Sequence, residues 1–146
     1  MNTDKIEIRL LATGDESLLD SIADGVFDHA IDPDFLREYL DEAHFHLAVA
    51  IDAGVVIGMA SAVDYIHPDK PRELWINEVG VTASHRGRGI AKRLLHALFA
   101  HGAELRCHQA WVLTNRSNAA AMRLYASLGG VANAEDTTMY EFAFSK

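Results

Sequence analysis

The sequence predicts an α/β fold, a mixed and mostly antiparallel sheet with helices on both faces, in one domain over residues 1–146. The chain is long enough to bury one core, and its 49% hydrophobic and 23% charged residues are typical of globular domains. Three consecutive strand-like segments predict antiparallel neighbours. A strand–helix–strand order follows, which adds a parallel strand and covers the sheet with helices.

The expected elements follow from local patterns. Asp32 before Pro33 is a helix N-cap followed by a residue suited to the first helical position. Asp52-Ala53-Gly54 supplies a hairpin turn, and Gly129-Gly130 ends the last helix. In chain order we expect strand 5–12, helix 15–28, helix 33–41, strand 44–51, strand 55–66, strand 73–82, helix 90–105, strand 110–114, helix 118–128, a short strand 131–133 and strand 139–144.

Charge and composition exclude several classes of protein. With 13 Lys and Arg against 21 Asp and Glu, the net charge is −8, so nucleic acid and anionic membranes are poor partners. The chain has no apolar run near the roughly 20 residues that span a bilayer, and its start lacks signal-peptide order. Cys107 is the only cysteine, so no internal disulfide can form. We therefore expect a cytoplasmic domain.

The segment Arg86–Ala91 predicts an anion site. A strand runs into a glycine turn that opens a helix, whose first amide groups have no intrahelical acceptor. Gly87 and Gly89 let the backbone approach phosphate oxygens closely. The segment lacks the lysine-containing pattern of a P-loop and the third glycine of a dinucleotide fingerprint. Four basic side chains and no acidic one lie in this region: Arg86, Arg88, Lys92 and Arg93.

Two motifs resemble those of the GNAT superfamily of acetyl-CoA-dependent N-acetyltransferases. The run Arg86-Gly87-Arg88-Gly89-Ile90-Ala91 is similar to the family's [QR]-x-x-G-x-[GA] loop, and residues 118–129 are similar to its N-x-x-A-x-x-[LF]-Y-x-x-x-G helix. The resemblance implies that all six loop residues bind the pyrophosphate of acetyl-CoA. It also implies that Asn118 contacts the cofactor and that Tyr125 protonates the leaving thiolate. Taken alone, Asn118 could be only a helix cap and Tyr125 only a core aromatic.

Glu78 is the candidate acid/base. Alternation along residues 75–81 would place Glu78 on one face with Ile76 and Gly80, and Trp75, Asn77 and Val79 on the other. A carboxylate inside so apolar a strand requires an explanation. The resemblance implies a bulge here that separates two parallel strands, with acetyl-CoA bonded to the backbone of Val79 and Val81 and the Val79 amide stabilising the oxyanion. A structural salt bridge or a simple exposed position is the alternative role for Glu78.

Within the superfamily, the run Glu73–Leu95 most resembles the short aminoglycoside 3-N-acetyltransferases. This resemblance implies a small cationic substrate held by carboxylates, for which the candidates are Glu78, Asp136, Glu141 and Asp32. Further acidic side chains could extend the lining: Asp28, Asp34, Glu38 and Asp41.

Other functions and assemblies stay open. The acceptor could be a polyamine, another small metabolite or a peptide N-terminus, and a catalytically silent acyl-CoA-binding module is a third possibility. His44 and His46 share one face of a strand but lack a third ligand, so we expect no metal and a surface position for that strand. By analogy with the family, the strand at residues 139–144 could pair across a two-fold axis in a homodimer.

Overall fold

The computed structural model describes residues 5–144, and the chain forms two compact units. Met1–Thr114 makes the first and Asn115–Lys146 the second. Within the described residues, no helix is both long enough and apolar enough to cross a membrane.

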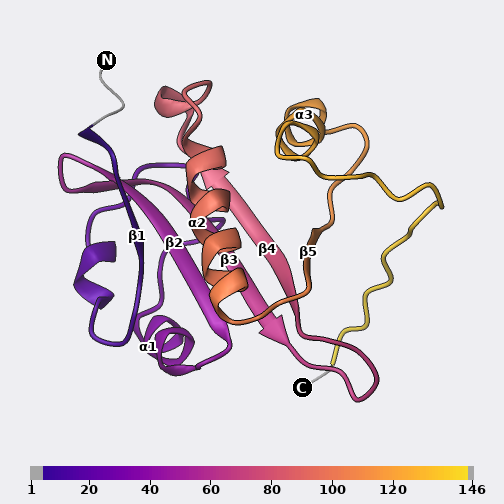
Figure 1. Ribbon diagram of the computed structural model, residues 1–146. Coiled ribbons are helices and arrows are strands. Elements are labelled where there is room, and N and C mark those ends of the chain that lie inside the picture. The colour runs from indigo at the N-terminus through magenta and orange to yellow at the C-terminus, as the bar shows by residue number, and fades with distance from the viewer. Residues whose placement is uncertain (1–4, 145–146) are drawn as a thin grey trace. The chain divides into compact units, whose positions relative to one another are not determined.

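The first unit is built on a five-stranded sheet (Figure 1). Its strands lie side by side in chain order: β1 (Glu7–Leu10), β2 (Phe45–Asp52), β3 (Val55–Tyr65), β4 (Glu73–Val81) and β5 (Gln109–Val112). The first four pair antiparallel, and β5 pairs parallel to β4 after the helical crossover. The predicted mixed, mostly antiparallel sheet is confirmed.

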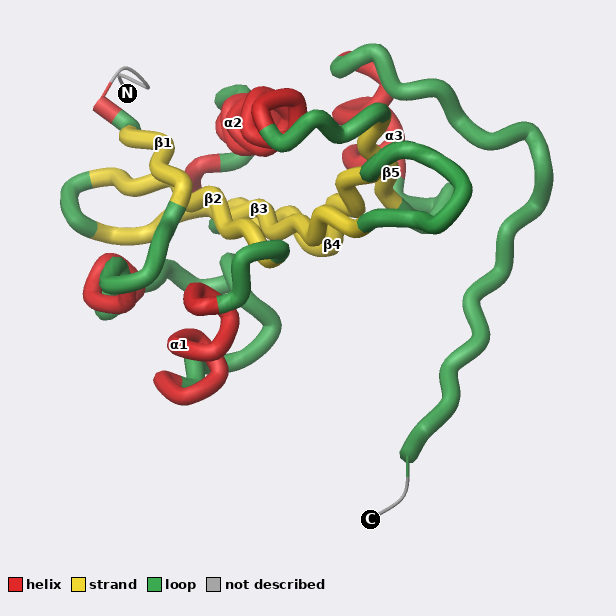
Figure 2. Tube along the Cα trace, turned by 60° about the horizontal axis from the view of Figure 1, so that its bottom comes forward, coloured by secondary structure: helices red, strands yellow, loops and turns green. Residues whose placement is uncertain are grey.

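Two helices cover opposite faces of this sheet, as Figure 2 shows for α1 (Pro33–Asp41) and α2 (Ile90–Glu104). On the α2 face, a Cβ added at Gly58 of β3 would lie 3.3 Å from a Leu94 methyl carbon, so the helix packs closely on the sheet. On the other face, buried leucines of α1 join apolar side chains of β2 and β3 in one core cluster: Leu36, Leu40, Leu47, Val49 and Met59. The predicted cap is also present, because Asp32 accepts from the Asp34 and Phe35 amides.

The helix predicted over residues 15–28 is wrong. Only a short 3-10 helix, η2 (Glu16–Leu19), forms there. The backbone that follows bonds to the start of β3 instead, since the Val56 amide donates to Ser21 O and the Ala23 amide to Val56 O, both at 2.9 Å. Apolar residues at helical spacing thus pack into the α1-side core from an irregular segment.

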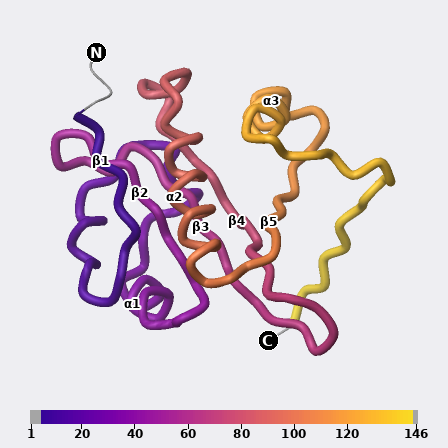
Figure 3. The backbone as a smooth tube through the Cα atoms, in the orientation of Figure 1, coloured from indigo at the N-terminus to yellow at the C-terminus, as the bar shows by residue number. Residues whose placement is uncertain are grey.

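The second unit contains α3 (Ala119–Ser127), which confirms the predicted helix. The strands predicted at 131–133 and 139–144 are absent from the described chain, which Figure 3 traces there as an irregular path. A strand needs a neighbour to accept its backbone hydrogen bonds, and neither segment has one among residues 5–144.

Candidate functional site

The glycine turn has the backbone geometry that an anion cradle needs. Gly87 and Gly89 both have φ near 76°, a region that side-chain-bearing residues rarely adopt. Gly89 is the N-cap of α2, so the first amides of that 15-residue helix open at the turn. Arg86 Nε donates to Val81 O at 3.0 Å, which ties the turn to the end of β4, and Arg88 Nη2 donates to Ser84 O at 3.1 Å in the connection after β4.

Neighbouring side chains brace the same turn. His85 Nε2 bonds to an Asp52 carboxylate oxygen at 2.8 Å, which joins the short helix η3 (Ala83–His85) to the end of β2. Arg93 Nη2 donates to Ile6 O at 2.8 Å, so this arginine ties α2 to the N-terminal segment. Lys92 is exposed. The basic residues therefore combine local bracing with positive potential beside the helix N-terminus.

β4, the strand that leads into the turn, pairs with β3 along one edge and with β5 along only part of the other edge. Pairing between β4 and β5 runs from Glu73–Gln109 to Ile76–Val112, and β4 continues beyond it to Val81. The Thr82 amide donates to Ile57 O, so Thr82 and Gly80 direct their backbone groups toward β3. Val79 and Val81 then direct theirs to the opposite edge. These are the two residues to whose backbone the family resemblance assigns acetyl-CoA.

A bulge lies where the resemblance implied one. Ser61 pairs with Glu78 and Ala62 pairs with Ile76, which leaves Asn77 as the extra residue of β4. The alternation expected for residues 75–81 is therefore wrong. The inserted residue puts Glu78 on the same face as Trp75, and apart from Ile76. This face carries α1.

Glu78 is exposed at the bulge, and two hydroxyl side chains lie behind it. Its amide donates to Ser61 Oγ at 3.2 Å. Tyr39 of α1 donates through its hydroxyl to His46 O at 2.6 Å. Burial, with a smaller contribution from the nearby Glu78 carboxylate, raises the pKa of Tyr39 to about 12. The sequence analysis missed Ser61 and Tyr39, because nothing in the pattern connects residues 39, 61 and 78.

Asp32, a predicted substrate ligand on the same side, has a structural role. Its Oδ1 accepts from the first-turn amides of α1 at 2.9 and 3.2 Å. Asp34 bonds to Arg37 in an exposed pair, while Asp28, Glu38 and Asp41 are exposed. Acidic side chains thus surround the helix that faces Glu78.

The remaining predicted residues belong to the second unit. Asn118 caps α3 and accepts from the Ala121 amide at 3.0 Å. Tyr125 is partly buried, and this burial raises the pKa of its hydroxyl. Asp136 and Glu141 are exposed in the irregular segment that follows α3. The first unit therefore brings together Glu78, Val79, Val81 and residues 86–91.

The expectation of a surface position for His46 is wrong. His46 is 8% exposed on the α2 face, with Nε2 at 2.6 Å from Asp64 Oδ1 and Nδ1 at 3.1 Å from His101 Nε2. Burial would raise the pKa of Asp64, but hydrogen bonds from two histidines and Arg72 hold it below its usual range. Among residues 5–144, no group of three His, Cys, Asp or Glu side chains could hold a metal ion.

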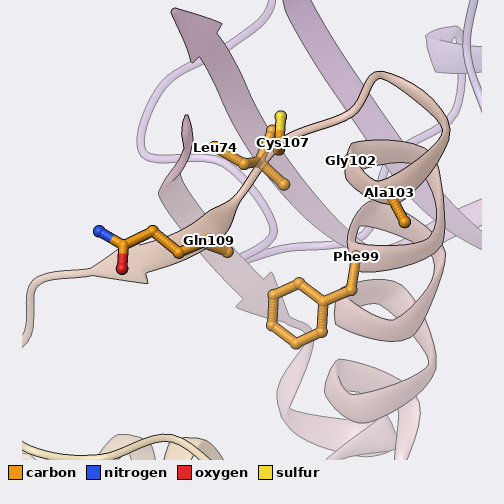
Figure 4. A pocket seen from close by; sticks show the side chains of 7 residues that line it. Leu74, Phe99, Gly102, Ala103, Cys107 and Gln109 are labelled. Atoms are coloured by element: carbon orange, nitrogen blue, oxygen red, sulfur yellow. The ribbon is translucent and has the colours of Figure 1, made fainter. Parts of the chain in front are cut away.

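A cavity of about 240 Å³ lies elsewhere, where the C-terminal part of α2 faces β5 (Figure 4). None of the predicted site residues lines it. Its lining is mostly apolar: Leu74, Phe99, Gly102, Ala103, Cys107, Gln109 and Ala110.

Comparison with known proteins gives a family. A family model described as the acetyltransferase (GNAT) family matches residues 16–130. The spermine/spermidine N(1)-acetyltransferase of Bacillus subtilis is 28% identical over 99 residues, which are 64% of this chain and 65% of that enzyme. The N-alpha-acetyltransferase RimI of Mycobacterium tuberculosis is 33% identical over 97 residues, 65% of this chain and 57% of that protein. The chain thus spans less than two thirds of the length of these relatives.

The fold has a close structural counterpart. The crystal structure of the aminoglycoside acetyltransferase meta-AAC0020, from an uncultured soil metagenomic sample and in complex with sisomicin, superposes with a TM-score of 0.81. It covers 98% of this chain and 100% of that one at 17% identity, a level that establishes the fold alone. Together with the family model, the glycine turn and the interrupted β4–β5 pairing lead to one conclusion: the chain belongs to the GNAT family of acetyltransferases.

Proposed function

We propose that the chain transfers an acetyl group from acetyl-CoA to an amine of a small cationic acceptor, with an aminoglycoside acetylated at its 3-N position as the first candidate. The observation that carries the proposal is the position of Glu78. Its exposed carboxylate lies at a bulge of β4, the strand that leads into the glycine turn. Next along this strand are Val79 and Val81, whose backbone groups point away from β3.

The residues present fit acetyl-CoA. The turn at residues 86–91 would hold the pyrophosphate, because it offers positive-φ glycines, helix N-terminal amides and basic side chains together. The edge of β4 at Val79 and Val81 would bond the extended arm, as an added strand would. When bound, acetyl-CoA supplies a thioester whose acyl carbon a neutral amine can attack.

Glu78 would attract the ammonium form of the acceptor and accept its proton, directly or through a water molecule. Tyr125 would act as the acid toward the departing thiolate. Burial raises the pKa of Tyr125, which keeps its hydroxyl protonated and able to donate. Asn118 would contact the cofactor in addition to capping α3.

The aminoglycoside acceptor is supported by the net charge of −8, by the exposed acidic side chains around α1 and by the 3-N resemblance of residues 73–95. A polyamine is the second candidate, which the 28% identity to a spermine/spermidine acetyltransferase favours. Both kinds of acceptor carry several positive charges. For either, we propose Asp136, Glu141 and Asp32 as further carboxylates toward the acceptor.

The test follows release of free CoA from acetyl-CoA with sisomicin, gentamicin, kanamycin, spermidine and an N-terminal peptide, in the wild type and Glu78→Gln. Glu7→Gln, which neutralises an exposed carboxylate on β1, is the matched control. Turnover of aminoglycosides that falls in Glu78→Gln and persists in the control supports the proposal, and product mapping identifies the nitrogen. Turnover of spermidine alone, or of the peptide alone, would identify that compound as the acceptor in place of an aminoglycoside. Binding of acetyl-CoA with no turnover of any amine would indicate the silent module.

A further inference from the structure

We propose that Ser61 and Tyr39 are positioning residues for Glu78, acting through a chain of contacts that fixes the bulge carrying this carboxylate. The inference rests on the proposed function and extends it to residues of β3 and α1. Neither residue belongs to the glycine turn or to the motif around Tyr125.

The first link joins the bulge to β3 through a side chain. At the bulge, β4 has one residue more than β3, and the extra residue Asn77 directly precedes the Ser61–Glu78 pair. The side chain of Ser61 adds a bond to this pair, since its Oγ accepts from the Glu78 amide at 3.2 Å. Ser61 is 6% exposed, so water has little access to take over this bond if the hydroxyl is removed.

The second link runs from β3 to α1. The Tyr39 hydroxyl lies near the Ser61 side chain, and it donates to His46 O of β2 at 2.6 Å. The contacts therefore lead from the Glu78 amide to Ser61 Oγ, on to the neighbouring Tyr39 hydroxyl, and end at a β2 carbonyl.

The chain has a direct consequence for Glu78. Its carboxylate is exposed, so few side-chain contacts fix its position, and the placement depends on the backbone beneath it. A displacement of about 1 Å at a reacting group can cost about 100-fold in rate. Loss of either hydroxyl should therefore lower kcat by about tenfold, while binding of acetyl-CoA at the separate glycine turn changes little.

A double-mutant cycle with Glu78→Gln tests this. Ser61→Ala and Tyr39→Phe are each measured in the wild type and in Glu78→Gln, for kcat and for the acetyl-CoA dissociation constant. Tyr65→Phe is the matched control, because Tyr65 lies on the same strand and face but donates to Glu73. We expect about a tenfold loss of kcat in each single variant, almost none on top of Glu78→Gln, and little change in the control. Equal losses in both backgrounds, or no loss in either, would overturn the proposal.

Hydrogen exchange separates this inference from the proposed function. The Glu78 amide should exchange slowly in the wild type and at least about tenfold faster in Ser61→Ala, whether or not an acceptor has been found. Unchanged protection would refute the anchoring by Ser61. If no amine is acetylated yet protection is lost in Ser61→Ala, the anchoring stands and the proposed acetyl transfer fails. If amines are acetylated but Glu78→Gln retains full activity, Glu78 is not the base. The positioning role of Ser61 and Tyr39 is then refuted.

Discussion

A Cβ atom on Gly80 would lie 2.5 Å from the carbonyl oxygen of Val26, so β4 touches the segment before α1 backbone to backbone. Gly80 is two residues from Glu78 and on the same face of the sheet. The irregular segment that replaced the predicted helix therefore packs directly beside the candidate base. The absence of a side chain at residue 80 is what allows this contact.

We expect Gly80→Ala to destabilise the protein. The obstructing atom belongs to a backbone carbonyl, so the segment must move, and overpacking of this kind costs about 1–3 kcal/mol. Thermal denaturation should show a Tm lower by roughly 3–10 °C. Gly102→Ala is the control, because its new Cβ would meet only side-chain atoms of Leu74, the nearest a methyl at 3.0 Å, and the substitution raises helix propensity. A Gly80→Ala variant as stable as Gly102→Ala would contradict this contact.

The glycine turn should lose affinity for acetyl-CoA in Gly89→Ala. The φ of 76° costs a side-chain-bearing residue about 1–2 kcal/mol, so the turn is expected to relax away from the binding geometry. Calorimetry should show acetyl-CoA binding about tenfold weaker. Gly14→Ala imposes similar strain at φ 96° in another turn and should leave the affinity unchanged. Equal affinity in Gly89→Ala and the wild type would exclude the turn as the pyrophosphate site.

Two substitutions of Asp32 distinguish a capping role from a substrate-binding role. Asp32→Ala removes the acceptor for two first-turn amides of α1 and should cost about 0.5–2 kcal/mol of stability. Asp32→Ser keeps a capping oxygen but removes the charge. If Asp32 also binds the cationic acceptor, Asp32→Ser should raise the KM for the acceptor at nearly unchanged Tm. An unchanged KM would restrict Asp32 to capping.

Stability should fall on acidification below about pH 6.5. Burial lowers the pKa of His46 below its usual 6.5, despite the Asp64 carboxylate bonded to it. Between that lowered pKa and 6.5, the unfolded chain binds more protons than the folded one, so the free energy of unfolding rises with pH in this window. Urea denaturation between about pH 5 and pH 8 measures the slope.

The His46→Gln variant supplies the comparison. It cannot titrate at residue 46, so its stability should depend less on pH in the same window, whatever its absolute value. His96→Gln, a change at an exposed histidine of α2, should keep the wild-type slope. If His46→Gln also keeps that slope, another group is responsible.

Local patterns predicted most of the first unit, because caps, turns and periodicity are local properties. The Asp32 cap, the turn at residues 52–54 and the glycines at 87 and 89 were all recognisable in the sequence. Alternation failed at Glu78, since a pattern with period two cannot reveal that Asn77 is inserted opposite β3. The bulge is set by pairing between β3 and β4, which are contacts between residues distant in the sequence.

Other parts of the site depended on tertiary contacts that no local pattern encodes. Tyr39 and Ser61 are 22 positions apart and meet only because α1 packs on β3. The strand pattern predicted a surface position for His46, because it cannot reveal the hydrogen bonds with Asp64 and His101 that hold this side chain in the interior. The segment 139–144 alternates like a strand, but alternation does not supply the partner that a strand requires.

The most direct test of the account is the rate of CoA release by Glu78→Gln relative to wild type, at saturating acetyl-CoA and with the best acceptor of the panel. If the exposed carboxylate at the bulge is the base, the rate should fall by about 100-fold or more, acetyl-CoA should still bind, and Glu7→Gln should match the wild type. A Glu78→Gln enzyme with full activity would contradict the assignment of Glu78 and with it the proposed organisation of the site.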